Sequence, residues 1–346
     1  MEGQLAATRP AVEETLEVEK ASLLKQPKAV WATALAAVFA FMGIGLVDPI
    51  LPAIAKNLDA TPSQVSLLFT SYFLVTAVAM LITGYVSSRI GGKKTLLIGL
   101  AVIVVFASLS GLSGSVASGG AGTAIMLMAA AFVALIALLP KTPLPERKVR
   151  FRDPLLALGH KGLRTTAASG LFYNFGFFTI LAFTPFILGM DAYGIGGVFF
   201  GWGVAVAVFS VFVAPVLQNR FGATRVLIGT LAVLMLDLAG LGLAAGHSVP
   251  AVVVLVVVSG ALLGINNTVY TELAMGVSNS PRPVASAGYN FVRWMGGALA
   301  PFAAAQLGEH FGPQVPFFAG ALAMVVAIAI AFGGRRFLAD HEPHVV

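Results

Sequence analysis

Cysteine is missing from this chain of 346 residues, and charged side chains make up only 10% of it. The absence of cysteine excludes disulfides, thiolate nucleophiles and cysteine-ligated metals. The low charge accompanies 58% hydrophobic residues and a mean hydropathy of +0.91. A water-soluble domain does not bury this much apolar surface, so we expect lipid to be the solvent for most of the chain.

Motifs for nucleotide or metal chemistry are missing as well. The chain has no Gly-rich phosphate loop ending in Lys-Ser/Thr and no His-Glu-x-x-His, and its five histidines are scattered over predicted loops and the carboxyl-terminal tail. We therefore expect no enzyme activity, no metal site and no cofactor. The net charge of +6 does not indicate nucleic-acid binding, because short basic loops between apolar runs are typical of membrane proteins.

Apolar runs long enough to cross a bilayer, which takes about 20 residues, follow one another along the chain. Residues 1–29 are polar and lack the basic, apolar and small-residue order of a cleaved signal, so we expect the first span to be retained. About ten spans are predicted. They lie at residues 30–54, 65–87, 95–113, 121–140, 166–189, 195–217, 226–246, 249–274, 284–307 and 315–333.

Lys and Arg fall in alternate loops between these spans. With the amino terminus inside the cell, Lys56 falls in an outer loop, Arg293 falls within a span, and the other basic residues are cytoplasmic. Because cytoplasmic loops retain basic residues, we expect a multi-pass protein of the inner (plasma) membrane with both termini in the cytoplasm. The predicted parts are a cytoplasmic tail (1–29), a shortened bundle of about four helices (30–140), a basic cytoplasmic linker (141–165), a six-helix bundle (166–334) and a cytoplasmic tail (335–346).

Two basic turns share the pattern Arg-x-Gly-x-x-Lys/Arg. One begins at Arg89, after the second span, and the other begins at Arg220, after the second span of the other half. The first outer loops of the two halves also match, at Asp59-Ala60 and Asp191-Ala192. A single such turn is explained as a positive-inside loop, but the duplication favours a family motif and two parallel halves of similar fold. The motif residues are Gly84, Arg89, Gly91, Lys93, Lys94, Arg220, Gly222 and Arg225.

The stretch from Gly84 to Lys94 resembles the signature loop of the major facilitator superfamily, Gly-x-Leu-x-Asp-Arg-x-Gly-Arg-Lys/Arg. The run from Asp48 to Pro52 is similar to the first helix of bacterial drug-efflux members. Thr271–Met275 and Gly288–Arg293 are similar to their tenth and eleventh helices. The resemblance implies an all-helical membrane transporter of two bundles. It also implies proton-coupled efflux of small hydrophobic or amphipathic compounds by alternating access.

The chain departs from the family in charge and in length. Ser88 and Asn219 stand where the family's loop has an Asp that holds the cytoplasmic gate closed. The stretch from Arg89 to Lys141 is about 60 residues shorter than its counterpart from Arg220 to Gly334, which is about two helices with their loops. We therefore expect about ten spanning helices instead of the family's twelve. The alternative is a transport-incompetent, degenerate homologue that at most binds a ligand or a partner.

Ionisable side chains inside spans are functional candidates, since each costs about 2.5 to 3.5 kcal/mol on insertion scales. Asp48 either faces a cavity, where it accepts a proton or a cationic substrate, or ends its helix near the outer surface. Arg293 lies near mid-membrane and must be paired or face water. Glu272 is close to the cytoplasmic end, which favours a surface role or an interhelix partner, and for Asp237 a structural hydrogen bond is favoured. The proton-coupling candidates are Asp48, Asp237 and Glu272.

Uncharged candidates for a substrate cavity are tyrosines and asparagines within the spans. A tyrosine ring offers an apolar face, and asparagine offers both donors and acceptors. Hydrogen bonding between helices explains such residues as well. The substrate-cavity candidates are Arg293, Tyr173, Asn174, Asn266, Asn267, Tyr289 and Asn290. In the same span as Arg293, the run Gly296–Pro301 permits close packing and a bend.

Overall fold

The computed structural model describes residues 52, 55–56, 59–112, 149–278 and 280–339. Within this part of the chain every regular element is helical, with no strand. Six of these helices are long and apolar enough to cross a membrane, which agrees with the predicted class of membrane protein. They are α3 (Pro62–Ile90), α7 (Lys161–Leu188), α8 continued through α9 (Ala192–Phe221), α10 (Ala223–Ala244), α11 (Val249–Gly276) and α13 (Val315–Gly333).

The remaining helices are one long, one intermediate and two short. α12 (Arg282–Phe311) is the longest helix described, α4 (Gly92–Leu112) follows α3, and α6 (Asp153–Ala157) and α14 (Arg335–Ala339) are single turns. Each predicted span within the described residues coincides with a helix. The predicted spans at 30–54 and 121–140 fall almost wholly outside the described residues, so the total of about ten stays a prediction.

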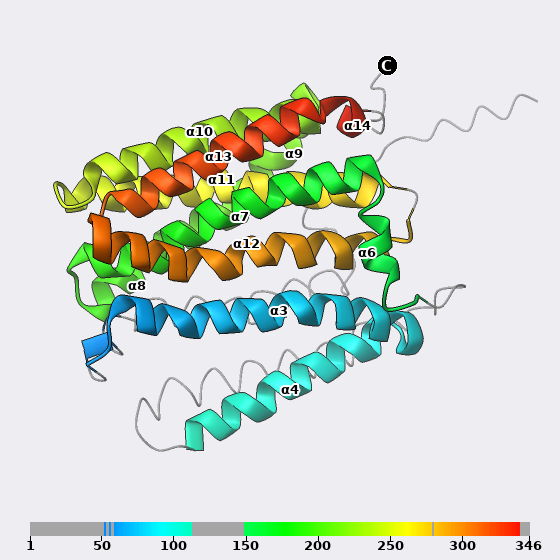
Figure 1. Cartoon of the computed structure of the whole chain (residues 1–346), viewed down its shortest axis with the longest axis horizontal. Helices are drawn as coiled ribbons and strands as arrows, with labels where there is room; N and C mark the ends of the chain where they lie inside the picture. The colour runs from blue at the N-terminus through cyan, green and yellow to red at the C-terminus, as the bar shows by residue number, and fades with distance from the viewer. Residues whose placement is uncertain (1–51, 53–54, 57–58, 113–148, 279, 340–346) are drawn as a thin grey trace, which may run out of the picture.

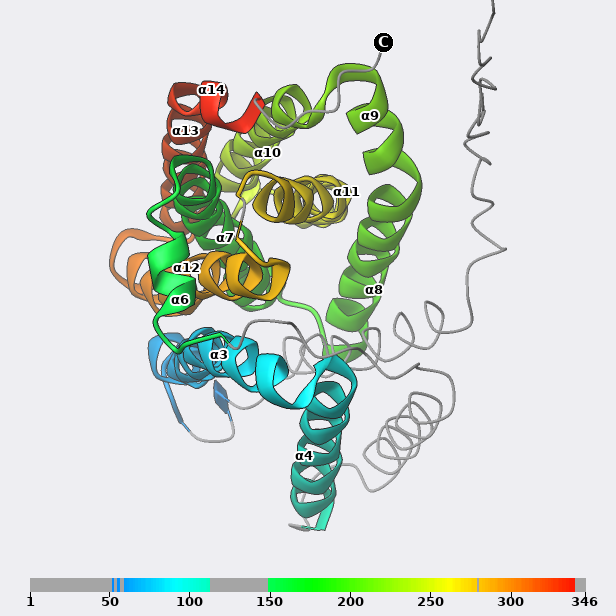
Figure 2. The ribbon, with the colours of Figure 1, turned by 90° about the vertical axis from the view of Figure 1, so that its right-hand side faces the viewer.

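The long helices run side by side, and α12 lies between α7 and α3 (Figures 1 and 2). Seen along the helices, α11 is surrounded by α7, α8, α10 and α12 (Figure 2). α13 packs against α7 and α10, and α4 lies beyond α3. α12 is therefore the element that joins the first half of the chain to the second.

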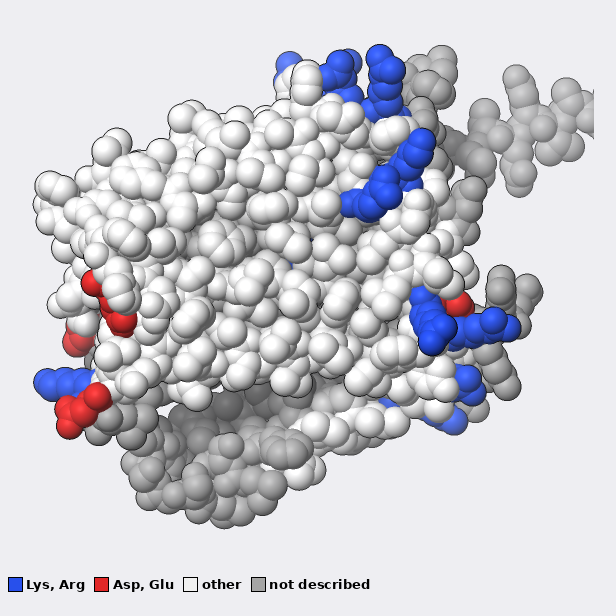
Figure 3. Space-filling model, in the orientation of Figure 1, with Lys and Arg blue, Asp and Glu red and all other residues white. Residues whose placement is uncertain are grey.

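Charge separates the two ends of the molecule, while the surface between them is almost free of it (Figure 3). We call the end where Lys and Arg gather the basic end, and the other end the acidic end. The basic end carries Arg89, Lys93, Lys94, Arg150, Arg152, Lys161, Arg164, Arg220, Arg225, Arg282, Arg335 and Arg336. The acidic end carries Asp59, Asp191 and Glu309, with Lys56.

The two turns that repeat in the sequence also repeat in the backbone. Gly91 and Gly222 adopt φ of 86° and 82°, a region that favours glycine. The N–H of Gly91 donates to Ser87 O at 3.0 Å, and the N–H of Gly222 donates to Gln218 O at 2.8 Å. Each glycine ends one helix and begins the next, which explains why this residue stands at the same place in both turns.

Close approaches of helix backbones hold α12 against its neighbours. A Cβ on Gly296 would lie 2.0 Å from the carbonyl oxygen of Leu171 on α7. A Cβ on Gly84 of α3 would lie 2.8 Å from the Cβ of Ala287 on α12. In lipid, helices associate through such packing of small residues rather than through hydrophobic burial. The close packing expected around Gly296 is therefore present.

Candidate functional site

Arg293 lies on α12, within the predicted span at residues 284–307. Its guanidinium donates hydrogen bonds to uncharged side chains. Its Nη1 donates to Oδ1 of Asn267 on α11 at 2.7 Å and to the hydroxyl of Tyr289, one turn earlier, at 3.2 Å. The guanidinium also lies over the Tyr289 ring, 5.6 Å from its centroid. The side chain is partly exposed, while its Nε is buried and has no hydrogen-bond partner among the described residues.

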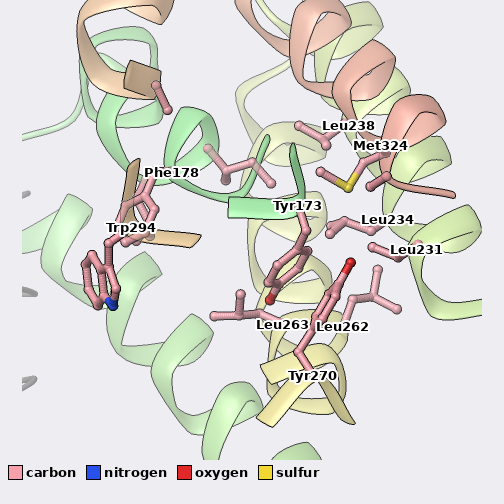
Figure 4. Packing of buried hydrophobic residues seen from close by; sticks show 14 of the residues in the cluster. Tyr173, Phe178, Leu231, Leu234, Leu238, Leu262, Leu263, Tyr270, Trp294 and Met324 are labelled. Carbon is pink, nitrogen blue, oxygen red and sulfur yellow. The ribbon is translucent and has the colours of Figure 1, made fainter. Parts of the chain in front are cut away.

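Three buried tyrosines converge beside this guanidinium from three helices. A Cβ on Gly170 of α7 would lie 3.3 Å from Tyr289 and 3.8 Å from both Arg293 and Tyr270. The rings of Tyr173 and Tyr270 have centroids 5.0 Å apart and lie side by side in Figure 4. We call Arg293, Asn267, Tyr173, Tyr270 and Tyr289 the Arg293 cluster.

The hydroxyls of these tyrosines differ in their partners. Tyr270 shares a 2.6 Å hydrogen bond with Ser169, and Ser169 also donates to the carbonyl oxygen of Ala327 on α13 at 2.9 Å. The Tyr173 hydroxyl is buried and has no hydrogen-bond partner in the part of the chain that the structure describes. Tyr270 is thus fixed by the fold, whereas Tyr173 keeps an unused donor.

An aromatic surface extends from the cluster towards α8. Phe177, one turn after Tyr173, stacks on it with ring centroids 6.4 Å apart and an interplanar angle of 14°. Phe177 also stacks on Trp202 of α8 at 6.0 Å and 13°. We call Tyr173, Phe177 and Trp202 the aromatic wall. Phe178, the next residue of α7, contacts Phe177 with ring centroids 4.6 Å apart and packs against Trp294 of α12 (Figure 4).

The other predicted asparagines have different surroundings. Asn266 faces α10, where its Oδ1 accepts from Thr230 at 2.7 Å. Asn290 donates to Ser286 in its own helix at 3.2 Å, and Asn174 is buried, with no described residue bonded to its Nδ2. Of the predicted cavity residues, the structure therefore brings together Arg293, Asn267, Tyr173 and Tyr289, and places Asn174 one turn after Gly170.

The predicted carboxylates are dispersed. Asp48 lies outside the described residues. Asp237 on α10 is 5% exposed, and neither carboxylate oxygen has a hydrogen-bond partner within the described chain, so the structural hydrogen bond expected for it is not made to a described residue and stays a prediction. Glu272 is exposed near the basic end of α11, where it accepts from Nε2 of Gln218 on α9.

The predicted gate motif lies at the basic end, in the turn between α3 and α4 and in the turn between α9 and α10. Gly84 provides the close approach to α12. The guanidinium of Arg89 lies 4.5 Å from the ring centroid of Tyr85, and the guanidinium of Arg220 lies 5.3 Å from that of Phe221. The motif residues Lys93, Lys94 and Arg225 lie in the first turns of α4 and α10. A surface pocket at the same end is lined by Val149, Asp153, Leu156, Ala157, Ser280, Pro281 and Val284.

A contact at the acidic end was not predicted. The N–H and Oγ of Ser63, in the first turn of α3, donate to the two carboxylate oxygens of Glu309 on α12 at 2.8 and 2.7 Å. A carboxylate there satisfies a free amide of the helix start and interacts favourably with its dipole. Sequence signals for this contact are weak, because Glu309 is an ordinary polar residue of a helix end.

The π-helical segment η3 (Phe209–Val213), between α8 (Ala192–Val208) and α9 (Ala214–Phe221), was also not predicted. Within it, Ser210 shares a 2.9 Å hydrogen bond with Thr268 of α11. A Cβ on Gly264 of α11 would lie 2.4 Å from the carbonyl oxygen of Val206. Such widened turns occur often at functional sites, and this one follows the turn of α8 that carries Trp202 by about two turns.

Comparison with known proteins places these features in a family. A family profile described as Major Facilitator Superfamily matches residues 33–141. The chain is 41% identical to "Multidrug efflux protein YfmO" of Bacillus subtilis (strain 168), over 93% of this chain and 96% of that protein. It is 39% identical to "Bacillibactin exporter" of the same organism over 22% of this chain and 17% of that protein. The solved human organic anion transporter MFSD10 has a similar fold, with a TM-score of 0.52 at 17% identity, over 88% of this chain and 83% of that one.

The alignment with the first relative bears on the length of the chain. It runs over 383 positions but takes in only 93% of the 346 residues here. About 60 of its positions therefore have no residue of this chain, which is about two spanning helices with their loops.

Proposed function

Because this chain belongs to the major facilitator superfamily, we propose that it exports small hydrophobic or amphipathic compounds in exchange for protons. Membership of the family and similarity to efflux proteins make it a multi-pass membrane transporter rather than an enzyme. The observation that carries the proposal is the Arg293 cluster, which sets a cation and three tyrosines among otherwise apolar helices. Ionisable and polar groups are retained at such depth where they contact a substrate.

The depth of the cluster supports a site near the middle of the membrane. Tyr173, Asn267 and Arg293 each lie about ten residues from the basic end of their helix, which is about 15 Å at the helical rise. That is half of a hydrocarbon core of about 30 Å. Transporters of this kind bind substrate at the midplane between their repeats.

The contacts of α12 with α3 support alternating access by rocking of two bundles. At the basic end the two helices meet at Gly84 and Ala287, and at the acidic end Glu309 bonds to Ser63. The middle is occupied by side-chain contacts such as Phe73 with Trp294, 5.5 Å between centroids. An opening at either end breaks one of these contacts and keeps the other.

Three carboxylates are proposed as proton carriers. Asp237 is favoured because it is buried within a span and its carboxylate oxygens have no hydrogen-bond partner among the described residues, and an ionisable group at such depth is a functional candidate. Glu272 is less favoured, because it is exposed and bonded to Gln218. Asp48 remains a candidate as the one carboxylate of the predicted first span.

The shortened first half favours a second candidate function. About 60 positions of the efflux relative have no counterpart here, about the length of two spanning helices. A chain that lacks two helices of one bundle but keeps the Arg293 cluster in the other would bind ligands without moving them across the membrane.

Transport in reconstituted vesicles separates the two functions. We load vesicles containing the purified protein with three aromatic probes in turn, 1-naphthaleneacetic acid, its amide and 1-naphthylmethylamine, and impose a pH gradient. Because the acid and the amine also distribute passively across a pH gradient, protein-free vesicles are the control, and accumulation of any probe beyond that control, abolished by a protonophore, supports the exporter. Asp48→Asn and Asp237→Asn should then be tested, because the coupling residue is the one whose neutral form retains downhill exchange and loses uphill accumulation. Binding without movement of any probe would establish the binding-only function.

A further inference from the structure

We propose that the Arg293 cluster selects organic anions, aromatic compounds that carry one carboxylate or a similar acidic group. The inference rests on the proposed function, since it names the class of compound that the site takes. It is carried by the charge of Arg293, by the hydrogen-bonding capacity left unused around it, and by the aromatic wall beside it.

The charge of Arg293 is not neutralised by any carboxylate in the described parts of the chain. Its bonded partners, Asn267 and Tyr289, are both uncharged. Asp237 is on α10 and has no hydrogen-bond partner, and Glu272 is bonded to Gln218 near the basic end. A cation at membrane depth is costly unless it is paired, so a ligand that brings the negative charge is stabilised by this site.

The unused polar atoms of the cluster and of the aromatic wall share one property. Arg293 Nε and the Tyr173 hydroxyl in the cluster, Asn174 Nδ2 beside it on α7, and Trp202 Nε1 at the α8 end of the wall are all buried without a partner among the described residues, and each carries a hydrogen to donate. Unmade hydrogen bonds of buried groups are destabilising, so they favour a ligand that supplies acceptors. A carboxylate supplies two oxygens with about four lone-pair sites and no donor.

The aromatic wall defines the rest of the ligand. Tyr173, Phe177 and Trp202 offer stacked rings that continue from the cluster to α8. Aromatic faces of this kind take up a flat apolar group next to a polar anchor. A cationic compound of the same shape would be repelled by Arg293, and a neutral one would leave the charge unpaired.

Equilibrium binding to the purified full-length protein in lipid nanodiscs tests the inference. The probes are 1-naphthaleneacetic acid, ionised at pH 7, and 1-naphthaleneacetamide, which has the same shape and no charge. The wild type should bind the acid at least about tenfold more tightly than the amide. Arg293→Gln should weaken binding of the acid by about 10- to 100-fold and change binding of the amide by less than about threefold.

Two further variants keep the test decisive. Arg282→Gln makes the same change at an exposed position of the basic end, at the start of the same helix, and should leave both affinities unchanged. Tyr173→Phe removes one unpaired donor without changing the ring, and should weaken the acid by about three- to tenfold even if Arg293→Gln does not fold.

The outcomes of binding and transport are separable. Equal affinity of the wild type for acid and amide would overturn the inference. That result is expected if another carboxylate of this chain neutralises Arg293. Export of the amide or the amine in preference to the acid would overturn it too, while the proposed function stood. Selective binding of the acid without transport would support the inference and reject the exporter.

Discussion

At the residue scale, the tyrosine hydroxyls of the Arg293 cluster differ in whether they have a hydrogen-bond partner. The Tyr270 hydroxyl is bonded to Ser169, which in turn bonds to the backbone of α13, so this pair ties α7, α11 and α13 together. The Tyr173 hydroxyl, in the same cluster, has no hydrogen-bond partner among the described residues. Both tyrosines are buried, so we expect Tyr270 to act in the fold and Tyr173 to be free to donate to a ligand.

Ser169→Ala tests the structural half of this distinction. The change leaves the Tyr270 hydroxyl buried without its partner, and should lower stability by about 1 to 3 kcal/mol. Ser71→Ala is the control, because Ser71 is exposed and its Oγ bonds only within its own helix, so it should change stability by less than about 0.5 kcal/mol. Thermal unfolding of both purified variants, followed by circular dichroism, measures the effect. Equal transitions for both variants would show that the bond to Tyr270 contributes nothing.

The sequence predicted some of these residues and missed others for a physical reason. Arg293 was found because a cation in an apolar run is costly wherever it points. Tyr270 and Trp202 were missed because a tyrosine or tryptophan is an ordinary member of a membrane helix, and its partner depends on the rotation of neighbouring helices. Asp237 was found, but its lack of a partner is visible only in the fold.

At the element scale, α12 carries the cluster's cation and also joins the halves of the chain. Glycine allows both tasks, since Gly296 lets α12 touch α7 at the backbone and Gly288 does the same with Pro154 of α6. α12 contacts α3 at both ends, at Gly84 of α3 near the basic end and at Glu309 of α12 near the acidic end. A tilt of α12 would therefore move Arg293 and change both contacts.

The Glu309 contact predicts a measurable latch at the acidic end. Because the chain contains no cysteine, Ser66→Cys introduces a single thiol, on the same face of α3 as Ser63 and 2% exposed in the native residue. Adding Glu309→Gln removes the charge-assisted bonds to the start of α3, and should speed labelling of this thiol by an impermeant maleimide about fivefold or more.

Asp59→Asn is the matched control for the latch. It makes the same change at the same end, and asparagine tolerates the positive φ of 47° at that position. Labelling in this control should equal that of Ser66→Cys alone. If Glu309→Gln labels no faster than the control, the contact does not hold the acidic end closed.

The sequence predicted which segments are helical, but not where each helix begins or where its turns widen. The apolar run at 166–189 predicted α7, but the helix begins at Lys161, because backbone hydrogen bonds continue past the end of the lipid-facing stretch. The π-helical segment Phe209–Val213 is set by its contacts with Gly264 and Thr268 on another helix. No local pattern encodes such a contact.

At the scale of the whole molecule, the basic residues and the repeated turns were the features that predicted the architecture. The duplicated Arg-x-Gly-x-x-Lys/Arg turns pointed to two similar halves, and the two glycines indeed share one backbone geometry. The same turns lie at one end of the molecule with the other basic residues (Figure 3). The predicted division into two bundles and the total number of spans involve residues outside the described part, so they stay predictions.

The asymmetry of charge between the two ends predicts the orientation of the protein in the membrane. Positive charge is retained in the cytoplasm, so the basic end should face inwards, and reporter fusions after residue 155 should report the inside while fusions after 117 and 192 report the outside. Single cysteines test the same point in the whole chain. Tyr193→Cys, at a position 91% exposed at the acidic end, should react with an impermeant maleimide in intact cells. Leu156→Cys, at a position 72% exposed at the basic end, should react only after the cells are opened. The reverse pattern would place the basic end outside, and the pH gradient that drives export in the vesicle assay would then have to be inverted.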